Sequence, residues 1–138
     1  MSKEPREILE YARTVAVVGA SRDPNKAGGS VPTALKDHGF KLFPINPTAD
    51  VLFGERVYRS LEDVPERVDV VEVFRPAAEA PEIAREAVAI GARALWLQLG
   101  IKSEEARRIA EAAGLDYVED HCMGVERARY QIDKRQAA

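Results

Sequence analysis

Cysteine and histidine are scarce in this chain. Its 138 residues include one cysteine, Cys122, and two histidines, His38 and His121. A single cysteine excludes a disulfide within the chain and any metal site built from several thiolates. The sequence also shows no Ser-His-Asp arrangement and no acid/base pair at an expected site. We therefore expect neither a metal centre nor catalytic residues.

An excess of positive charge and long apolar runs are also missing. The formal net charge is −3, which provides no attraction for nucleic acid or for an anionic membrane. No apolar run approaches the roughly 20 residues of a membrane span, and residues 1–13 lack the apolar core of a signal peptide. We therefore expect a cytoplasmic protein with neither nucleic acid nor membrane as a partner.

The chain instead alternates short apolar runs with amphipathic segments. Its length predicts one domain, 1–138. Five apolar runs predict strands of a parallel sheet that is covered on both faces, at 14–19, 41–46, 69–74, 93–99 and 115–119. Helices are expected at 5–13, 29–38, 81–90 and 103–113, with a short turn at 60–64 and a frayed charged helix or tail at 126–138.

This alternation predicts an α/β fold. We expect a Rossmann-like, doubly wound sheet of about five parallel strands with helices on both faces. With the strands numbered along the chain, the expected order is 3-2-1-4-5. Ligands of such sheets bind beyond the carboxyl ends of the strands. The segments that follow the five strands there are 19–30, 46–49, 74–77, 98–101 and 120–125.

The loop after the first strand reads GASRDPNKAGGS. A dinucleotide fingerprint would need glycine where Ser21 and Pro24 stand, and no G-K-[ST] of a nucleoside-triphosphate loop follows. What remains is a glycine-containing turn into a helix, whose free N–H groups favour an anion. The alternative is a loop that only connects strand and helix. The candidate anion-binding residues are Gly19, Ser21, Arg22, Asp23, Pro24, Asn25, Lys26, Gly28, Gly29 and Ser30.

Asn46 and Pro47 follow the second strand. An NAD site carries Asp or Glu here, to accept hydrogen bonds from the ribose hydroxyls. A carboxylate would repel a phosphorylated ribose, whereas an amide and a proline ring would tolerate one. Because coenzyme A (CoA) carries a 3′-phosphate on its ribose, the missing acid favours CoA over NAD. The alternative is that Asn-Pro only makes a turn.

Taken together, the segments resemble the CoA-binding domain family, which includes the N-terminal domain of the succinyl-CoA synthetase alpha subunit and small free-standing bacterial proteins. The matching pieces are VVGASRDPNKAG at 17–28, PINP at 44–47, DVVEVFRPA at 69–77, LWLQLGI at 95–101 and DHCMGVE at 120–126. The resemblance implies CoA or an acyl-CoA as ligand. It would place the phosphates at Ser21–Asn25 and the helix start, the adenosine beside Asn46, Pro47, Phe74, Arg75 and Pro76, and the pantetheine arm beside Gln98, Leu99 and Gly100.

The chain departs from the synthetase pattern in three ways. Where that pattern reads Asn-Cys-Pro-Gly, this chain has His121-Cys122-Met123-Gly124. A lysine that shortly follows the proline in the synthetases is missing from 48–50, so Lys26, Arg22 or Arg75 would have to balance the 3′-phosphate. The phosphorylated histidine of the synthetases belongs to a separate ligase domain, which this sequence lacks. The synthetase chemistry is therefore not expected here.

Our leading interpretation is a protein that binds CoA or acyl-CoA without catalysis, with an unknown protein partner left open. Cys122 is interpreted either as a packing residue or, in a thiol-handling protein, as the site of a mixed disulfide with CoA. A small NAD(P)-dependent oxidoreductase on the same fold is a further alternative. His38 is expected to cap a helix or lie at the surface, and Trp96 to lie in the core.

Overall fold

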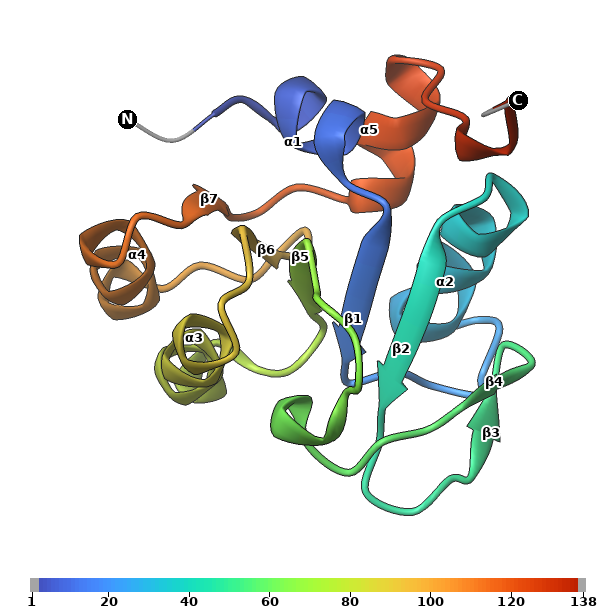
Figure 1. Ribbon diagram of the computed structural model, residues 1–138, viewed down its shortest axis with the longest axis horizontal. Coiled ribbons are helices and arrows are strands. Elements are labelled where there is room, and N and C mark those ends of the chain that lie inside the picture. Colours follow the sequence, from blue (N-terminus) through green and yellow to red (C-terminus); the bar gives the residue numbers. More distant parts are fainter. Residues whose placement is uncertain (1–2, 137–138) are drawn as a thin grey trace.

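Five parallel strands form one sheet between two layers of helices in the computed structural model, which describes residues 3–136 (Figure 1). The strands of this sheet are β1 (Thr14–Val18), β2 (Lys41–Ile45), β5 (Val70–Val73), β6 (Ala94–Leu97) and β7 (Asp116–Val118). The helices are α1 (Pro5–Tyr11), α2 (Ala27–Asp37), α3 (Ala80–Ala89), α4 (Glu104–Ala112) and α5 (Met123–Arg129). Short 3-10 turns lie at Leu61–Asp63, Ala77–Glu79 and Lys134–Gln136. The predicted α/β fold class is confirmed.

The order of the strands differs from the predicted one. The sheet runs β2-β1-β5-β6-β7, which is 2-1-3-4-5 when its strands are numbered along the chain, in place of 3-2-1-4-5. Pro44 explains why β2 lies at an edge. Proline cannot donate a ladder hydrogen bond, and strands that contain it belong at sheet edges. The carbonyl of Pro44 accepts the N–H of Tyr58 (2.9 Å) on the side away from β1.

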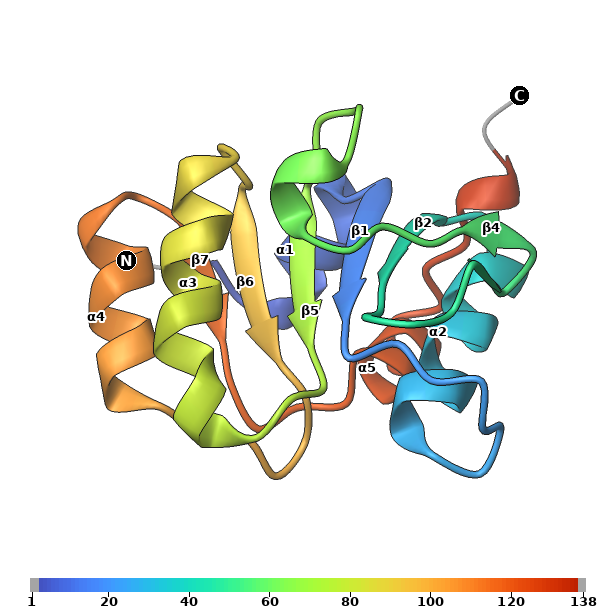
Figure 2. The ribbon, with the colours of Figure 1, turned by 90° about the horizontal axis from the view of Figure 1, so that it is seen from below.

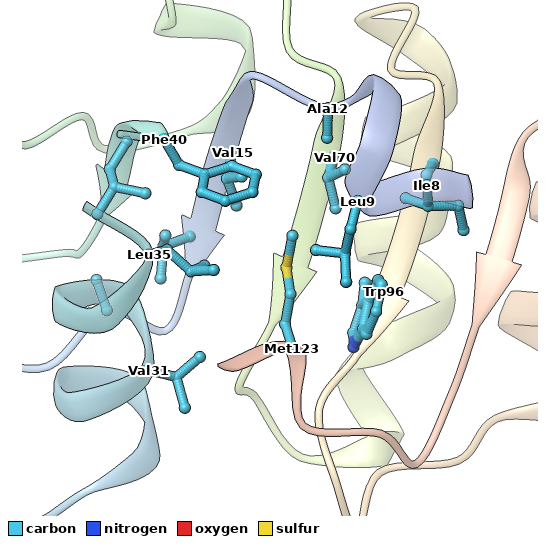
Figure 3. Close-up of a cluster of buried hydrophobic side chains, with 14 of the residues drawn as sticks. Ile8, Leu9, Ala12, Val15, Val31, Leu35, Phe40, Val70, Trp96 and Met123 are labelled. Atoms are coloured by element: carbon cyan, nitrogen blue, oxygen red, sulfur yellow. The ribbon is translucent and has the colours of Figure 1, made fainter. Parts of the chain in front are cut away.

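Alternate residues of the strands face two separate apolar layers. Val15 and Val17 belong to a cluster with residues of α1, α2 and α5, whereas Ala16 belongs to a cluster with residues of α3 and α4. Figure 3 shows the first cluster, in which Trp96 and Met123 pack beneath α1. Trp96 is fully buried, as predicted. Burial on both faces accounts for the consecutive apolar residues of the strands.

Local sequence signals account for the ends of several helices. The side chain of Ser103 accepts a hydrogen bond from the Ala106 N–H (3.1 Å), which caps α4 as its Ser-Glu-Glu start suggests. His38 is the C-cap residue of α2, and its Nδ1 lies 2.8 Å from the Ala34 carbonyl oxygen. Sequence analysis did not predict the small hairpin of β3 (Val51–Leu52) and β4 (Glu55–Arg56).

The C-terminal segment is packed against the domain, which differs from the frayed helix predicted at 126–138. Helix α5 contacts α1 and α2, and Glu126 is buried. After α5, the Lys134 N–H donates to the His38 carbonyl (2.7 Å), and Lys134 Nζ donates to the Glu10 carbonyl (2.7 Å). Residues 137–138 lie outside the described residues.

The strand order creates a crevice between β1 and β5. These strands are neighbours, but α2 follows β1 on one face of the sheet and α3 follows β5 on the other. Figure 2 shows the loops after β1, β5 and β6 at the same edge of the sheet. Such a switch point is where doubly wound sheets hold their ligands.

In residues 3–136, no helix has both the length and the apolar character needed to cross a membrane.

Candidate functional site

A cleft of about 1070 Å³ opens at the carboxyl ends of β1, β2, β5 and β6. Ten of the residues predicted from the sequence line it: Gly19, Ser21, Lys26, Gly28, Asn46, Pro47, Phe74, Arg75, Gln98 and Leu99. The other nine do not: Arg22, Asp23, Pro24, Asn25, Gly29, Ser30, Pro76, Gly100 and Cys122. The structure thus brings together residues from four segments that are distant in the sequence.

The polar residues of the first loop mostly hold the loop itself. The Asp23 N–H donates to the Ser21 side chain (3.0 Å), and the Asn25 N–H donates to the Asp23 side chain (2.9 Å). The Ser21 N–H donates to the Gly28 carbonyl (3.0 Å) and closes the loop onto the start of α2. Asp23 and Asn25 therefore shape the loop without lining the cleft.

The start of α2 is uncapped where it faces the cleft. Lys26 is the N-cap residue and makes no side-chain capping bond, and the first turn contains no acidic residue. Lys26, Ala27 and Gly28 all line the cleft. The first N–H groups of a helix lack partners within the helix, and they carry the positive end of its dipole. Together with the Lys26 ammonium, this helix start is suited to an anion such as a phosphate.

Asn46 joins the ends of β1 and β2. Its side-chain amide donates to the Ala20 carbonyl (3.0 Å), and its side-chain oxygen accepts from the N–H groups of Thr48 (2.9 Å) and Ala49 (2.8 Å). Both functional groups of this side chain are therefore engaged in holding the turn. Asn46 lines the cleft as predicted, and it also makes the turn that was the alternative interpretation.

Gln98 supplies a polar atom without a partner. The residue follows β6, lines the cleft and is only 5% exposed. Its side-chain oxygen is buried and accepts no hydrogen bond within the described residues. A buried acceptor without a partner is costly, by about 1–3 kcal/mol. A ligand that donates an N–H or O–H group in the cleft would remove this cost.

The α3 side of the cleft is acidic. Arg75 forms two hydrogen bonds with Glu79, from Nε (3.1 Å) and Nη2 (2.8 Å), and this pairing holds the pKa of Glu79 below its ordinary value. Glu82 and Glu86 line the same side, where burial raises the pKa of Glu86 and the charge of Glu82 adds to the effect. An anionic group is therefore better placed toward α2 than toward α3.

Several residues of the cleft were missed by sequence reasoning. Ala20, Ala27 and Ile101 lie within segments that the sequence pointed to, although they were not among the candidate residues. The others lie on α3 and its preceding turn, around the 3-10 turn at Leu61 and at strand ends: Val18, Ile45, Arg59, Ser60, Leu61, Ala78, Glu79, Glu82, Ile83 and Glu86. Only their position in the folded chain assigns them to the cleft. Arg59 is the cation among them.

Cys122 and His121 lie outside the lining of the cleft. Cys122 is half-buried and precedes α5, where its Sγ would lie 3.8 Å from a Cβ on Gly124. His121 Nδ1 lies 2.7 Å from the Glu119 carbonyl oxygen, and the backbone carbonyl of His121 accepts from Trp96 (2.9 Å). Within residues 3–136, no group of three or more His, Cys, Asp or Glu residues could hold a metal ion.

Comparison with known families identifies the chain. A family model described as a CoA binding domain matches residues 13–128. The chain belongs to this CoA-binding domain family. One relative is the uncharacterized protein YneT of Bacillus subtilis, which is 34% identical over 125 residues, covering 91% of this chain and 93% of that protein.

The CoA-binding domain is also similar to part of larger enzymes. It is 36% identical to the ADP-forming acetate–CoA ligase II of Archaeoglobus fulgidus over 105 residues, which are 75% of this chain but only 16% of the ligase. Among solved structures, a Thermus thermophilus protein has a TM-score of 0.87 at 35% identity and covers 93% of this chain and 99% of its own. A hypothetical protein from Pyrococcus horikoshii has a TM-score of 0.89 at 33% identity, and the match covers 92% of this chain and 89% of that chain.

Proposed function

We propose that this CoA-binding domain binds coenzyme A or an acyl-CoA in the cleft, without catalysis of its own. One observation carries the proposal. The uncapped start of α2 lines the same cleft as Gln98, whose buried side-chain oxygen has no hydrogen-bond partner among the described residues. The first favours an anion and the second needs a hydrogen-bond donor. CoA offers both, a diphosphate and the amide N–H groups of its pantetheine arm.

The diphosphate of CoA is assigned to the start of α2. The N–H groups of Ala27 and Gly28 and the ammonium of Lys26 would donate to phosphate oxygens there. The Lys26 side chain makes no ion pair within the part of the chain that the structure describes. It is therefore available to a ligand without losing an existing partner.

The pantetheine arm is assigned to the end of β6. The side-chain oxygen of Gln98 would accept from one of its amide N–H groups, and Leu99 would contact its apolar part. Leu99 is one of the large apolar residues that remain exposed, at 63%. A ligand that covers part of this side chain gains hydrophobic stabilisation in proportion to the apolar area removed from water.

The absence of catalysis is part of the proposal. In the ligases that resemble this chain, most of the protein lies outside the matched region. Among the described residues, the titratable ones that line the cleft are Lys26, Arg59, Arg75 and the acidic residues of the α3 side. The Ser60 hydroxyl donates to the Asp63 carboxylate (2.9 Å), but Asp63 does not line the cleft. Asn46 in place of an acid at the end of β2 supports CoA over NAD.

Isothermal titration of the protein with CoA, acetyl-CoA, NAD, NADP and ATP tests the proposal. We expect saturable binding of CoA and acetyl-CoA that is at least about tenfold tighter than binding of the other three. Native mass spectrometry of the purified protein would identify any ligand that co-purifies. Saturable binding of NAD or NADP without binding of CoA would overturn the proposal.

A further inference from the structure

Arg59 is held at the end of β2 by three contacts. Its Nη1 donates to the backbone carbonyls of Asn46 (3.1 Å) and Ala49 (2.6 Å), and its Nη2 donates to the Asp50 carboxylate (3.0 Å). Arg59 lines the cleft together with Asn46 and Pro47. It therefore stands at the turn where sequence analysis found no cation.

The other cations of the cleft are placed elsewhere. Lys26 lies at the start of α2, where the diphosphate is assigned. Arg75 follows β5 and is bound to Glu79 through two hydrogen bonds. Arg22, a third candidate from the sequence, does not line the cleft. Among the described residues, Arg59 is thus the cation that the cleft presents at the end of β2.

The end of the second strand is where sheets of this class recognise the ribose. Carboxylates there bind the ribose hydroxyls of NAD, and a nearby arginine accommodates a ribose phosphate. The planar fork of a guanidinium suits the oxygens of a phosphomonoester. We infer that Arg59 recognises the 3′-phosphate of CoA and makes the cleft selective for CoA over dephospho-CoA. This inference rests on the proposed function.

Asp50 opposes this selectivity. Its side chain is 89% exposed, and the side chain of its partner Arg59 is 50% exposed. Exposed ion pairs contribute little to stability, so a phosphate can displace this carboxylate at small cost. The displaced carboxylate would still lie near the phosphate and repel it. Removal of the Asp50 charge should therefore strengthen the preference for the phosphorylated ligand.

The test is the ratio of the dissociation constants of dephospho-CoA and CoA, measured by isothermal titration. This ratio isolates the contribution of the 3′-phosphate. If the substitution only loosened the turn that Arg59 holds, it would weaken the binding of both ligands alike. For the native protein we expect CoA to bind about tenfold more tightly than dephospho-CoA. This ratio corresponds to one charge-assisted contact with the phosphate, weakened because Arg59 is exposed to solvent. Arg59→Gln should bring the ratio to within about twofold of one, and Asp50→Asn should raise it above the native value.

Arg56→Gln is the matched control. Arg56 is an exposed arginine on β4, and its guanidinium lies 5.5 Å from the centre of the Tyr58 ring. The Arg56→Gln substitution removes the same charge from the same region as Arg59→Gln, and it should leave the native ratio of dissociation constants unchanged. If CoA binds but Arg59→Gln keeps the native ratio, the role of Arg59 is overturned while the proposed function stands. If CoA does not bind the native protein, both are overturned.

Discussion

A Cβ atom on Gly28 would lie 2.7 Å from the carbonyl oxygen of Gly19. The neighbouring Gly29 is even more confined, because its Cβ would lie 2.2 Å from the Asp23 carbonyl oxygen. Real Cβ atoms do not approach backbone atoms so closely. Sequence analysis named both glycines among the candidate anion-binding residues. In the structure the pair allows the start of α2 to pack directly on the preceding loop.

Gly28→Ala should therefore destabilise the protein and weaken CoA binding. Alanine normally stabilises a helix relative to glycine by about 1 kcal/mol, but here the loop or the helix must shift to admit the methyl group. We expect a net loss of about 1–3 kcal/mol in the free energy of unfolding, as for other overpacked sites. Urea denaturation of the native and variant proteins measures this difference.

Gly124→Ala provides the control for this substitution. Gly124 also lies in a helix, but its Cβ would meet Val31 at an ordinary contact distance of 3.5 Å. This variant should be as stable as the native protein or more stable, by up to about 1 kcal/mol. A Gly28→Ala variant that gains stability as well would contradict the packing role of Gly28.

Lys26 and Arg22 should differ in their effects on CoA binding, although both are exposed cations of the same loop region. Lys26 lines the cleft at the start of α2, whereas Arg22 does not line it. Lys26→Gln should raise the dissociation constants of CoA and dephospho-CoA together, by about tenfold, because one charge-assisted contact with the diphosphate is lost. Arg22→Gln should change neither by more than about twofold. An equal loss in the two variants would indicate a long-range charge effect in place of a contact.

Gln98→Leu should change stability and affinity in opposite directions. The leucine removes a buried oxygen that has no partner, so the free protein should be as stable as the native one or more stable, by about 1 kcal/mol. It also removes the acceptor assigned to a pantetheine amide, so CoA should bind about fivefold to tenfold more weakly. Thermal denaturation without ligand and titration with CoA measure the two effects. Unchanged affinity would place the pantetheine arm away from Gln98.

Most of the secondary structure could be predicted because the strands are short, mostly apolar and separated by amphipathic helices. The strand order could not be derived from this pattern, because two doubly wound orders share the same alternation. Pro44 was the residue that could have distinguished the two strand orders. A proline within an apolar run indicates an edge strand, and the predicted order had placed that strand inside the sheet.

The candidate site was predictable where motifs directly follow strands, as at Lys26, Asn46 and Gln98. Arg59 was missed because it lies in an irregular segment, and only the paired backbone of Ile45 and Tyr58 brings that segment beside β2. The acidic side of the cleft was missed for a related reason. Glu79 and Glu82 belong to a turn and helix whose orientation depends on how α3 packs on the sheet.

Glu72 is a fully buried carboxyl group in the middle of the sheet. It lies on β5 in register with Val17 on one side and Trp96 on the other, and neither of its side-chain oxygens has a hydrogen-bond partner among the described residues. Burial raises the pKa of Glu72 to about 8, because the charged form loses its hydration. At neutral pH the folded protein therefore holds this carboxyl protonated.

The stability of the protein should consequently fall as the pH rises. Between pH 4.5 and about 8, the unfolded carboxyl has lost its proton while the folded one retains it, so unfolding releases a proton. The free energy of unfolding then decreases by about 1.4 kcal/mol per pH unit and levels off above pH 8. In Glu72→Gln this contribution is absent. The native free energy of unfolding, relative to that of the variant, should fall by about 2–3 kcal/mol from pH 5.5 to 7.5.

Urea denaturation at a series of pH values measures this relative change, with Glu104→Gln as a control that removes an exposed carboxylate from the first turn of α4. The control should follow the pH dependence of the native protein. Parallel curves for the native protein and Glu72→Gln would show that the buried carboxyl does not bind its proton more tightly in the folded state.

Because Glu72 lies two residues before Phe74 of the cleft, its ionisation would disturb the same strand that supports the ligand. CoA affinity in the native protein should therefore weaken above pH 8 more than it does in Glu72→Gln.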